Sequence, residues 1–454
     1  MTRDTSDYAY HYLSAQLRME NDRNFAQMAR KSQIGPQNLQ HFMSHSPWSA
    51  RSVIEQVQQE IAQTPDLLVG SVLLLDESAE EKASEKSIGC ARQYNGRQGK
   101  VDRRAGISTA FDMSQMGVFL AYANLDVNLW SWVDADLYLP KHWFAPEKAA
   151  LREKLGMPTN REFATKWQLG LSMIQKAHTQ GLPFEMVACD AHYGQCSQFR
   201  HALDQAGIGY CADVAANERV YLQCPAFGVP EGCGIGRIPE IARVLDETPA
   251  LTVQEVGQLA DTCWQTMRVR PTERGYLEEA FAFVQVWTLR DGHPVQEWLI
   301  MREESDHKIS YALSNAPSDT SLDRLAWSKC VRYFVERSNQ DAKSELGFDE
   351  FCGQRWLAWE HHVALTILSC WFVAQTKLDW SRDYPRDPLL ASEWEVDVLP
   401  ALSTANVREL LRATMPLPQL SEDEAAQLVV THLVNRTRSR KSRLIHRKGA
   451  SPPV

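Results

Sequence analysis

Three acidic residues stand where the sequence predicts the edge of a folded core. Asp76 closes the apolar run "DLLVGSVLLLDES", and Asp190 closes "LPFEMVACDAHYG" just before a turn. Short apolar runs between turn signals are typical of strands buried on both faces of a sheet, although periodicity alone leaves a buried helix open. Glu336 comes later, in "VRYFVERSNQDAKSELG", which we predict to be one helix.

Helical periodicity gives this glutamate two charged neighbours. A rotation of about 100° per residue brings four apolar residues within about 60° of one another, which predicts a face packed on a core. These residues are Val331, Val335, Ala342 and Leu346. Arg332, Glu336 and Lys343 fall within about 40° of one another at the rim of that face. Taken alone, the trio indicates an i,i+4 ion pair on a solvated face, worth a few tenths of a kcal/mol.

Carboxylates that converge from distant parts of a chain have a specific use. Their oxygens are hard ligands for Mg²⁺ or Mn²⁺, and two such ions about 3.5–4 Å apart can clamp both oxygens of an in-line phosphoryl displacement. Without a cation, three converging acids would repel and raise one another's pKa. If folding gathers Asp76, Asp190 and Glu336, a purely structural role is therefore disfavoured.

The composition places these residues in a large folded protein. With 454 residues, 44% of them apolar, the chain is expected to form two or more hydrophobic cores. Ten cysteines occur without a CxxC pair, and the N-terminus lacks a signal-peptide layout, so we expect a reducing cytoplasm and no structural zinc. The apolar run from Val363 is shorter than the roughly 20 residues that span a bilayer, which predicts a buried helix and no membrane partner.

Basic residues are concentrated in two segments, although the net charge is −9. Binding to a polyanion depends on such patches rather than on the total. The first segment directly follows the predicted Asp76 strand and contains Lys82, Lys86, Arg92, Arg97, Lys100, Arg103 and Arg104. The second, "RTRSRKSRLIHRKG", lies near the C-terminus, where a basic run is often only a solvated end.

The remaining pattern favours an α/β fold, a mixed sheet flanked by helices. Further strands are predicted at 105–113, 116–127 and 208–216, and helices at 145–155, 164–180 and 196–207. Three antiparallel strands are predicted at 280–289, 295–303 and 308–315. Near the N-terminus, Ser46 or Ser49 could cap the second of two short helices.

We therefore divide the chain into five parts. They are a helical N-terminal region (1–65), the first part of a catalytic core (66–216), a β-rich insertion (217–321), the second part of the core with the Glu336 helix (322–383), and a helical C-terminal region with a basic tail (384–454). The N-terminal region either binds DNA or only packs on the core.

This ordered series resembles the DDE transposases of bacterial insertion sequences, which have an RNase H-like core. The resemblance is to the cut-and-paste branch whose helix carries Tyr-x2-Arg-x3-Glu-x6-Lys, where Arg332, Glu336 and Lys343 match the last three positions. Lys329 stands at the tyrosine position, and Tyr333 comes four residues later. Other similar stretches are "LLLDES", "SIGCARQYNGRQGKVDRR", "ADLYLPKHW", "ACDAHYG" and "ELGFDEFCGQRWLAWEHHVAL".

The resemblance implies roles for individual residues. Asp76, Asp190 and Glu336 would be the catalytic residues and the ligands of two Mg²⁺ or Mn²⁺ ions per site. The residues expected to contact DNA are Arg332, Lys343, Lys82, Arg97, Lys100, Arg103, Arg104 and Trp298. An aromatic of the insertion, Trp287 or Trp298, could stack on an extruded base, although either is more often plain core in an alternating strand.

The resemblance also implies an activity: metal-dependent cleavage at transposon ends, followed by attack of the freed 3′-hydroxyl on target DNA. The partners would be double-stranded DNA and a second copy of the chain, as a homodimer on DNA, in the bacterial cytoplasm at the nucleoid. Two alternatives remain open, a domesticated DNA-binding protein and an RNase H-like nuclease without strand transfer.

Several other residues have plainer interpretations. His361 and His362 are interpreted as hydrogen-bonded histidines at the edge of the core, and Cys189 as a packing residue. His192 and Tyr193 either line the site or only form the turn after Asp190. The run "GCGIG" lacks the strand and helix of a phosphate-binding loop.

Overall fold

The computed structural model describes most of the chain. The described residues are 4–32, 34–82, 86–94, 111–230, 242–259, 261–272, 275–290, 292–304, 307–383, 402–414 and single positions between 421 and 441. Four predicted DNA contacts, Arg97, Lys100, Arg103 and Arg104, lie outside these residues, as does "GCGIG".

One sheet of ten strands organises the fold, in the order β11-β12-β13-β14-β6-β5-β1-β3-β2, with β4 also paired to β3. Its centre is parallel, because β1 pairs with β5 and β5 with β6 in parallel, and the other pairs are antiparallel. The central strands are β1 (Ser71–Glu81), β2 (Ala91–Tyr94), β3 (Phe111–Asn124), β4 (Leu129–Tyr138), β5 (Met186–Cys189) and β6 (Gly209–Val214). This is the mixed, RNase H-like α/β core that the sequence predicted.

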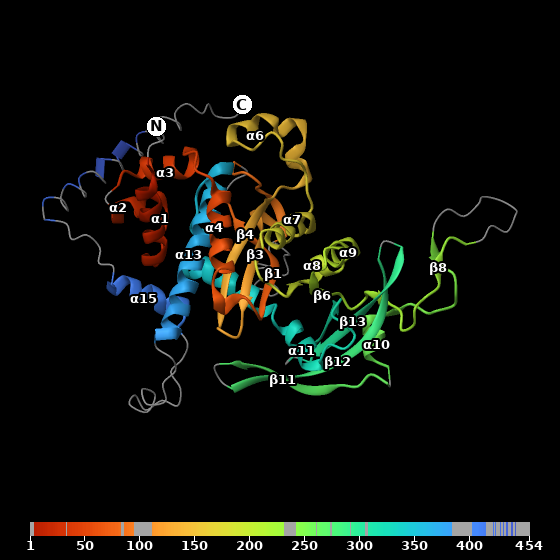
Figure 1. The fold of residues 1–454 in the computed structure, drawn as a ribbon. Helices are drawn as coiled ribbons and strands as arrows, with labels where there is room; N and C mark the ends of the chain where they lie inside the picture. The colour runs from red at the N-terminus through yellow and green to blue at the C-terminus, as the bar shows by residue number, and fades with distance from the viewer. Residues whose placement is uncertain are drawn as a thin grey trace.

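Helices cover both faces of this sheet (Figure 1). On one side α13 (Trp356–Asp383) packs against β4 and against α4 (Ala50–Ala62), and on the other α7 (Lys166–Thr179) packs on β3 and β4. The shorter helices of this part are α6 (Ala149–Leu155), α8 (Ala191–Gly194) and α9 (Ser197–Gln205). Ser49 caps α4 by accepting a hydrogen bond from the backbone N–H of Ser52 (3.1 Å), which confirms one of the two predicted caps.

The three strands predicted within the insertion are present, and they extend the central sheet. The elements of this region are β11 (Gln265–Thr272), β12 (Gly275–Arg290), β13 (His293–Glu303), β14 (Ile309–Ser314), α10 (Val253–Gly257) and the short strands β7 (Arg219–Val220), β8 (Phe227–Gly228), β9 (Arg243–Val244) and β10 (Leu251–Thr252). Pairing of Tyr311 with Val214 joins β14 to β6. A second apolar cluster, which includes Val256, Val286 and Leu299, packs here apart from the main core.

The N-terminal helices and one helix near the C-terminus pack on the core. The N-terminal helices are α1 (Ser6–Arg18), α2 (Phe25–Ser32) and α3 (Pro36–His45), and α15 (Thr404–Thr414) lies against α1. Arg408 of α15 forms an ion pair with Glu345 (2.6 Å) and donates to the carbonyl of Met19 (2.6 Å). The N-terminal helices therefore contribute to the packing of the core, which leaves a DNA-binding role for them untested.

Two predictions of local structure were wrong. The segment 331–347 is not one helix: α11 (Leu322–Cys330) ends before it, α12 spans Tyr333–Gln340, and a π-helical turn follows at Asp341–Glu345. Within the described part of 105–127, one long strand, β3, replaces the two predicted strands. The pattern of apolar residues could not predict either feature. The same pattern is compatible with an α-helix that ends in a π turn, and with one long strand in place of two short ones.

The predicted buried helix at Val363 is the centre of α13. This helix is long and apolar enough to cross a membrane by length and composition, but 78% of its most apolar window is buried inside the fold. Its contacts with α4, α3 and β4 account for its hydrophobicity, because a helix that is apolar on every side is expected where it is surrounded by protein.

Candidate active site on the central strands

Two of the three predicted acids lie side by side near the centre of the sheet. Asp190 directly follows β5, as predicted, but the prediction that Asp76 ends its strand was wrong, because β1 continues to Glu81 and Asp76 pairs with Phe119 of β3. Leu75 of β1 is in parallel register with Cys189 of β5, so the next residues, Asp76 and Asp190, occupy equivalent positions on adjacent strands. Both strands are apolar and buried up to this point, with Leu75 and Cys189 fully buried. The sequence therefore places the two carboxyl groups where the apolar run ends and the chain can reach solvent.

The turn after β5 orients the second aspartate. Asp190 is the N-cap of α8, and its Oδ1 accepts a hydrogen bond from the backbone N–H of His192 (3.0 Å). Gly194, at the end of that turn, packs so closely on β6 that an added Cβ would lie 1.9 Å from the carbonyl oxygen of Asp213. Only glycine allows the turn to approach β6 at this distance.

The electrostatics of the site reflect crowding of negative charge. Burial, and secondly the charge of Asp190, raise the pKa of Asp76 to about 7, while the charge of Arg332 opposes the shift. Burial also raises the pKa of Asp190, with a further increase from Glu77 and again opposition from Arg332. Raised carboxyl pKa values at the mouth of a sheet are typical of functional sites.

Arg332 is the positive charge that connects the acids. Its Nε lies 3.1 Å from Oδ2 of Asp213 on β6, and its Nη2 lies 3.5 Å from Oε1 of Glu336. The pKa of Arg332 is raised, because the favourable charges of Asp213, Asp76, Glu336 and Asp190 outweigh the effect of burial. The guanidinium group thus contacts two carboxylates, those of Asp213 and Glu336, and lies within electrostatic reach of Asp76 and Asp190.

Glu336 differs from the two aspartates. Its side chain is 60% exposed, and it forms the i,i+4 ion pair with Arg332 that the plain interpretation of this helix predicted. Among the residues that the structure describes, no three His, Cys, Asp or Glu side chains are close enough to hold a metal ion together. Asp76 and Asp190 fit a divalent cation, because their carboxylate oxygens are hard ligands and the two charges repel each other when no cation is bound. Glu336 contacts Arg332 and does not join the two aspartates as a third ligand.

The predicted DNA contacts fall in different surroundings. Lys82 and Lys343 both point into the protein: Lys82 Nζ donates to the carbonyl of Phe351 (2.8 Å), and Lys343 Nζ pairs with Glu80 (2.5 Å). Trp298 is half-buried in β13, and its indole N–H donates to the carbonyl of Pro317 (3.0 Å). Among the predicted contacts that the structure describes, Arg332 is the one that lies beside the acids.

Sequence reasoning missed two residues beside Arg332. Asp213 follows no conspicuous pattern in β6, and the family resemblance marks Lys329 only as the residue at the tyrosine position of the helix motif. Lys329 is buried, and its Nζ lies 2.6 Å from Oδ1 of Asp213. One signal in the sequence could have indicated the Lys329–Asp213 pair. Lys329 lies among apolar residues of a helix, three residues before Arg332.

The plainer interpretations are confirmed where the structure describes them. Both ring nitrogens of His361 lie near carbonyl oxygens, those of Met43 (2.9 Å) and Trp48 (3.0 Å), and the residue is fully buried. Cys189 is fully buried in β5. Tyr193 is also buried, whereas His192 is exposed, so of these two neighbours only His192 faces solvent.

The sheet and its paired aspartates define an RNase H-like α/β protein with a carboxylate site on adjacent parallel strands. The family model described as DDE superfamily endonuclease matches residues 1–275; this is more than half of the chain, and the chain belongs to that family. The match includes Asp76 and Asp190 and ends before Glu336. Proteins of this family generally use divalent metals.

A relative with a described role is more distant. The chain is 25% identical over 191 residues to a protein of Microchaete diplosiphon described as "Probable transposase for insertion sequence element IS701". The alignment covers 40% of this chain and 42% of that protein, so the chain spans less than half the length of this relative.

Proposed function

We propose that this chain is the transposase of an insertion sequence, which cuts DNA at the ends of its element and joins the freed 3′-hydroxyl to target DNA. The observation that carries the proposal is the placement of Asp76 and Asp190 at equivalent positions of adjacent parallel strands, with Arg332 held between them and Glu336. The similarity to a probable transposase supports the choice of this activity within the endonuclease family.

Two balanced phosphoryl transfers make up the reaction. In the first, water attacks phosphorus, a P–O bond forms, and the P–O3′ bond breaks, which leaves a 3′-hydroxyl and a 5′-phosphate. In the second, that hydroxyl attacks a target phosphate and displaces another 3′-oxygen. Divalent cations, two per site, would be held by Asp76, Asp190 and Glu336, which would have to leave Arg332 to reach them, and would supply positive charge that offsets the developing charge of phosphoryl transfer.

The chain's own residues would position the scissile strand. Arg332, which Asp213 holds through Nε, would offer its remaining N–H groups to phosphate oxygens and offset charge that develops in the transition state. The basic segment with Arg97, Lys100, Arg103 and Arg104 would bind the DNA backbone, and association should weaken steeply with salt. Bringing two ends together favours a homodimer on DNA.

The test uses DNA that carries the terminal inverted repeats flanking the gene. The full-length protein should nick this DNA in the presence of Mg²⁺ and not in EDTA, and the cut 3′ end should become joined to a second DNA. Nicking without joining would favour a nuclease of the same family. Binding of the repeats without nicking would favour a domesticated DNA-binding protein.

A further inference from the structure

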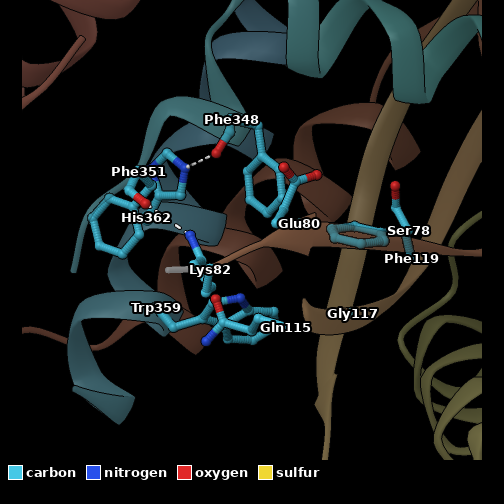
Figure 2. Close-up of a pocket in the computed structure, with 10 residues that line it drawn as sticks. All are labelled: Ser78, Glu80, Lys82, Gln115, Gly117, Phe119, Phe348, Phe351, Trp359 and His362. Atoms are coloured by element: carbon cyan, nitrogen blue, oxygen red, sulfur yellow. Dashed lines mark hydrogen bonds between the residues drawn. The ribbon is translucent and has the colours of Figure 1, made fainter. Parts of the chain in front are cut away.

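A buried group of charges lies beyond Asp76 on the same strand. Residues of a strand alternate between its faces, so Ser78, Glu80 and Lys82 share the face of β1 that carries Asp76. Glu80 and the lysine that pairs with it, Lys343, have side chains that are only 10% exposed each. Figure 2 shows Glu80 and Lys82 among Phe348, Phe351, Trp359 and His362.

This group leaves no room for a ligand. The cavity between its side chains has a volume of about 10 Å³, which is at the lower limit for a single water molecule. Lys343 Nζ lies 2.5 Å from Glu80 Oε1 and donates to the carbonyl of Ala79 (3.3 Å). Its charge is therefore neutralised inside the protein and is not presented to a phosphate.

The ion pair joins the two elements that carry the acids. Glu80 is four residues after Asp76 on β1, about 13 Å along an extended strand, and Lys343 lies in the π turn that directly follows α12. Because α12 packs against β1 and Arg332, at the start of α12, is close enough for its charge to act on Asp76, the Glu80–Lys343 contact holds the other end of this segment on the same strand. Breaking it would let the helix slide along the strand.

We propose that the Glu80–Lys343 ion pair fixes the register of α12 on β1, which positions Arg332, and Glu336 through its pairing with Arg332, relative to Asp76. The inference rests on the proposed function, since it assigns Glu80 and Lys343 as positioning residues for DNA cleavage. Lys343 then acts through Glu80 and not as a phosphate ligand. An unpaired lysine or glutamate at this depth is strongly unfavourable, so each residue requires the other.

The experiment compares full-length variants on a fluorescent duplex that carries the terminal inverted repeat. For each variant we would measure the dissociation constant across a salt series and the single-turnover cleavage rate at saturating DNA, with urea denaturation as the check of folding. Lys343→Met should keep the salt dependence of the wild type and cleave on the order of tenfold to a hundredfold more slowly. Arg332→Ala is the comparison, and its salt slope should fall by about one.

Charge reversal separates the two roles of Lys343. Lys343→Glu should lose cleavage, and Glu80→Lys combined with Lys343→Glu should recover most of it, because the pair is restored in the opposite sense. A phosphate ligand could not be rescued in this way. If Lys343→Met fails to fold, Glu80→Gln, which conserves shape, should show slow cleavage with an unchanged salt slope.

Either of two results would overturn the inference: a salt slope lowered by about one in Lys343→Met, or a reversed pair that cleaves no better than its single variants. A wild type that binds the repeat but never cuts it would instead refute the proposed function. The two failures can be told apart, because the variants test the Glu80–Lys343 inference only if the wild-type protein cleaves the repeat.

Discussion

Oδ1 of Asp213 lies 2.6 Å from Nζ of Lys329, a side chain that is only 2% exposed. The other oxygen of the same carboxylate holds Arg332 at 3.1 Å. One carboxylate on β6 therefore supports both cations of the segment that leads into α12. Removing a partner from a buried ion pair strands an uncompensated charge.

Asp213→Asn is accordingly expected to lower the free energy of unfolding by about 2–3 kcal/mol. Cleavage should fall further than end binding, because Arg332 loses its anchor. Urea denaturation and single-turnover cleavage test the two effects. The control is Asp213→Leu with Lys329→Met, which removes both charges and should unfold at higher urea than the single variant; a double variant less stable than Asp213→Asn would contradict this account.

Asp76→Asn should stabilise the protein in EDTA at pH 8. The pKa of Asp76 is raised to about 7 in the folded protein, against about 3.9 in an unfolded chain. As pH rises through that interval, the unfolded state releases this proton first, and wild-type stability falls. Asp76→Asn carries no charge at this position and does not lose this stability. At pH 8 its free energy of unfolding should therefore exceed that of the wild type by about 2 kcal/mol after allowance for solvent screening.

Urea denaturation at pH 4, 6 and 8 measures this difference. The curves of wild type and Asp76→Asn should nearly coincide at pH 4 and separate up to about pH 7, with the variant more stable. A difference that does not change with pH would show that the carboxyl group of Asp76 is ionised equally easily in both states.

Glu336→Ala should abolish cleavage while binding of the terminal repeat survives. The side chain is 60% exposed, so its removal should change stability by less than about 0.5 kcal/mol, and lost activity could not be attributed to unfolding. Asp76→Ala and Asp190→Ala should behave alike in cleavage. The matched control is Gln340→Ala, one turn further along α12 and also exposed, which should cleave DNA at the normal rate. If Glu336→Ala were active, Glu336 would not belong to the active site.

The local part of the site could be predicted from the sequence. The apolar runs before Asp76 and Asp190 are long enough to be strands buried on both faces, so the first acid after each run stands where full burial ends. Asp190 also ends its strand, whereas β1 continues past Asp76 to Glu81. Parallel pairing of the two apolar runs then brings the acids together. Ser49 could be predicted for a similar reason, since capping depends on residues within one turn.

The long-range contacts of the fold and of the site could not be predicted from the sequence. The pairing of β14 with β6, which merges the insertion with the core sheet, depends on register between segments about a hundred residues apart. A helical wheel placed Lys343 beside Glu336 at the rim of the core, whereas α12 gives way to a π turn that contains Lys343, and the side chain reaches Glu80. Both outcomes depend on contacts that no local pattern encodes.

The buried imidazole of His362 predicts how the free energy of unfolding decreases at acidic pH. Nε2 donates to the carbonyl of Phe348 (3.0 Å), so Nδ1 must accept the hydroxyl proton of Tyr12 (2.7 Å), and the ring is neutral. Burial lowers its pKa to about 3, whereas an unfolded chain protonates histidine near 6.5. Stability is therefore complete above pH 6.5 and falls below it by up to about 1.4 kcal/mol per pH unit.

His362→Gln preserves a donor and an acceptor and removes this titration. Below pH 6.5 its free energy of unfolding should decline less steeply than that of the wild type, by up to about 1.4 kcal/mol per pH unit in urea denaturation at pH 7, 6 and 5. Tyr12→Phe is the control, because it lowers stability at every pH but leaves the imidazole and its slope in place. Parallel curves for wild type and His362→Gln would mean that this ring takes up its proton without unfolding, against the geometry that surrounds both of its nitrogens.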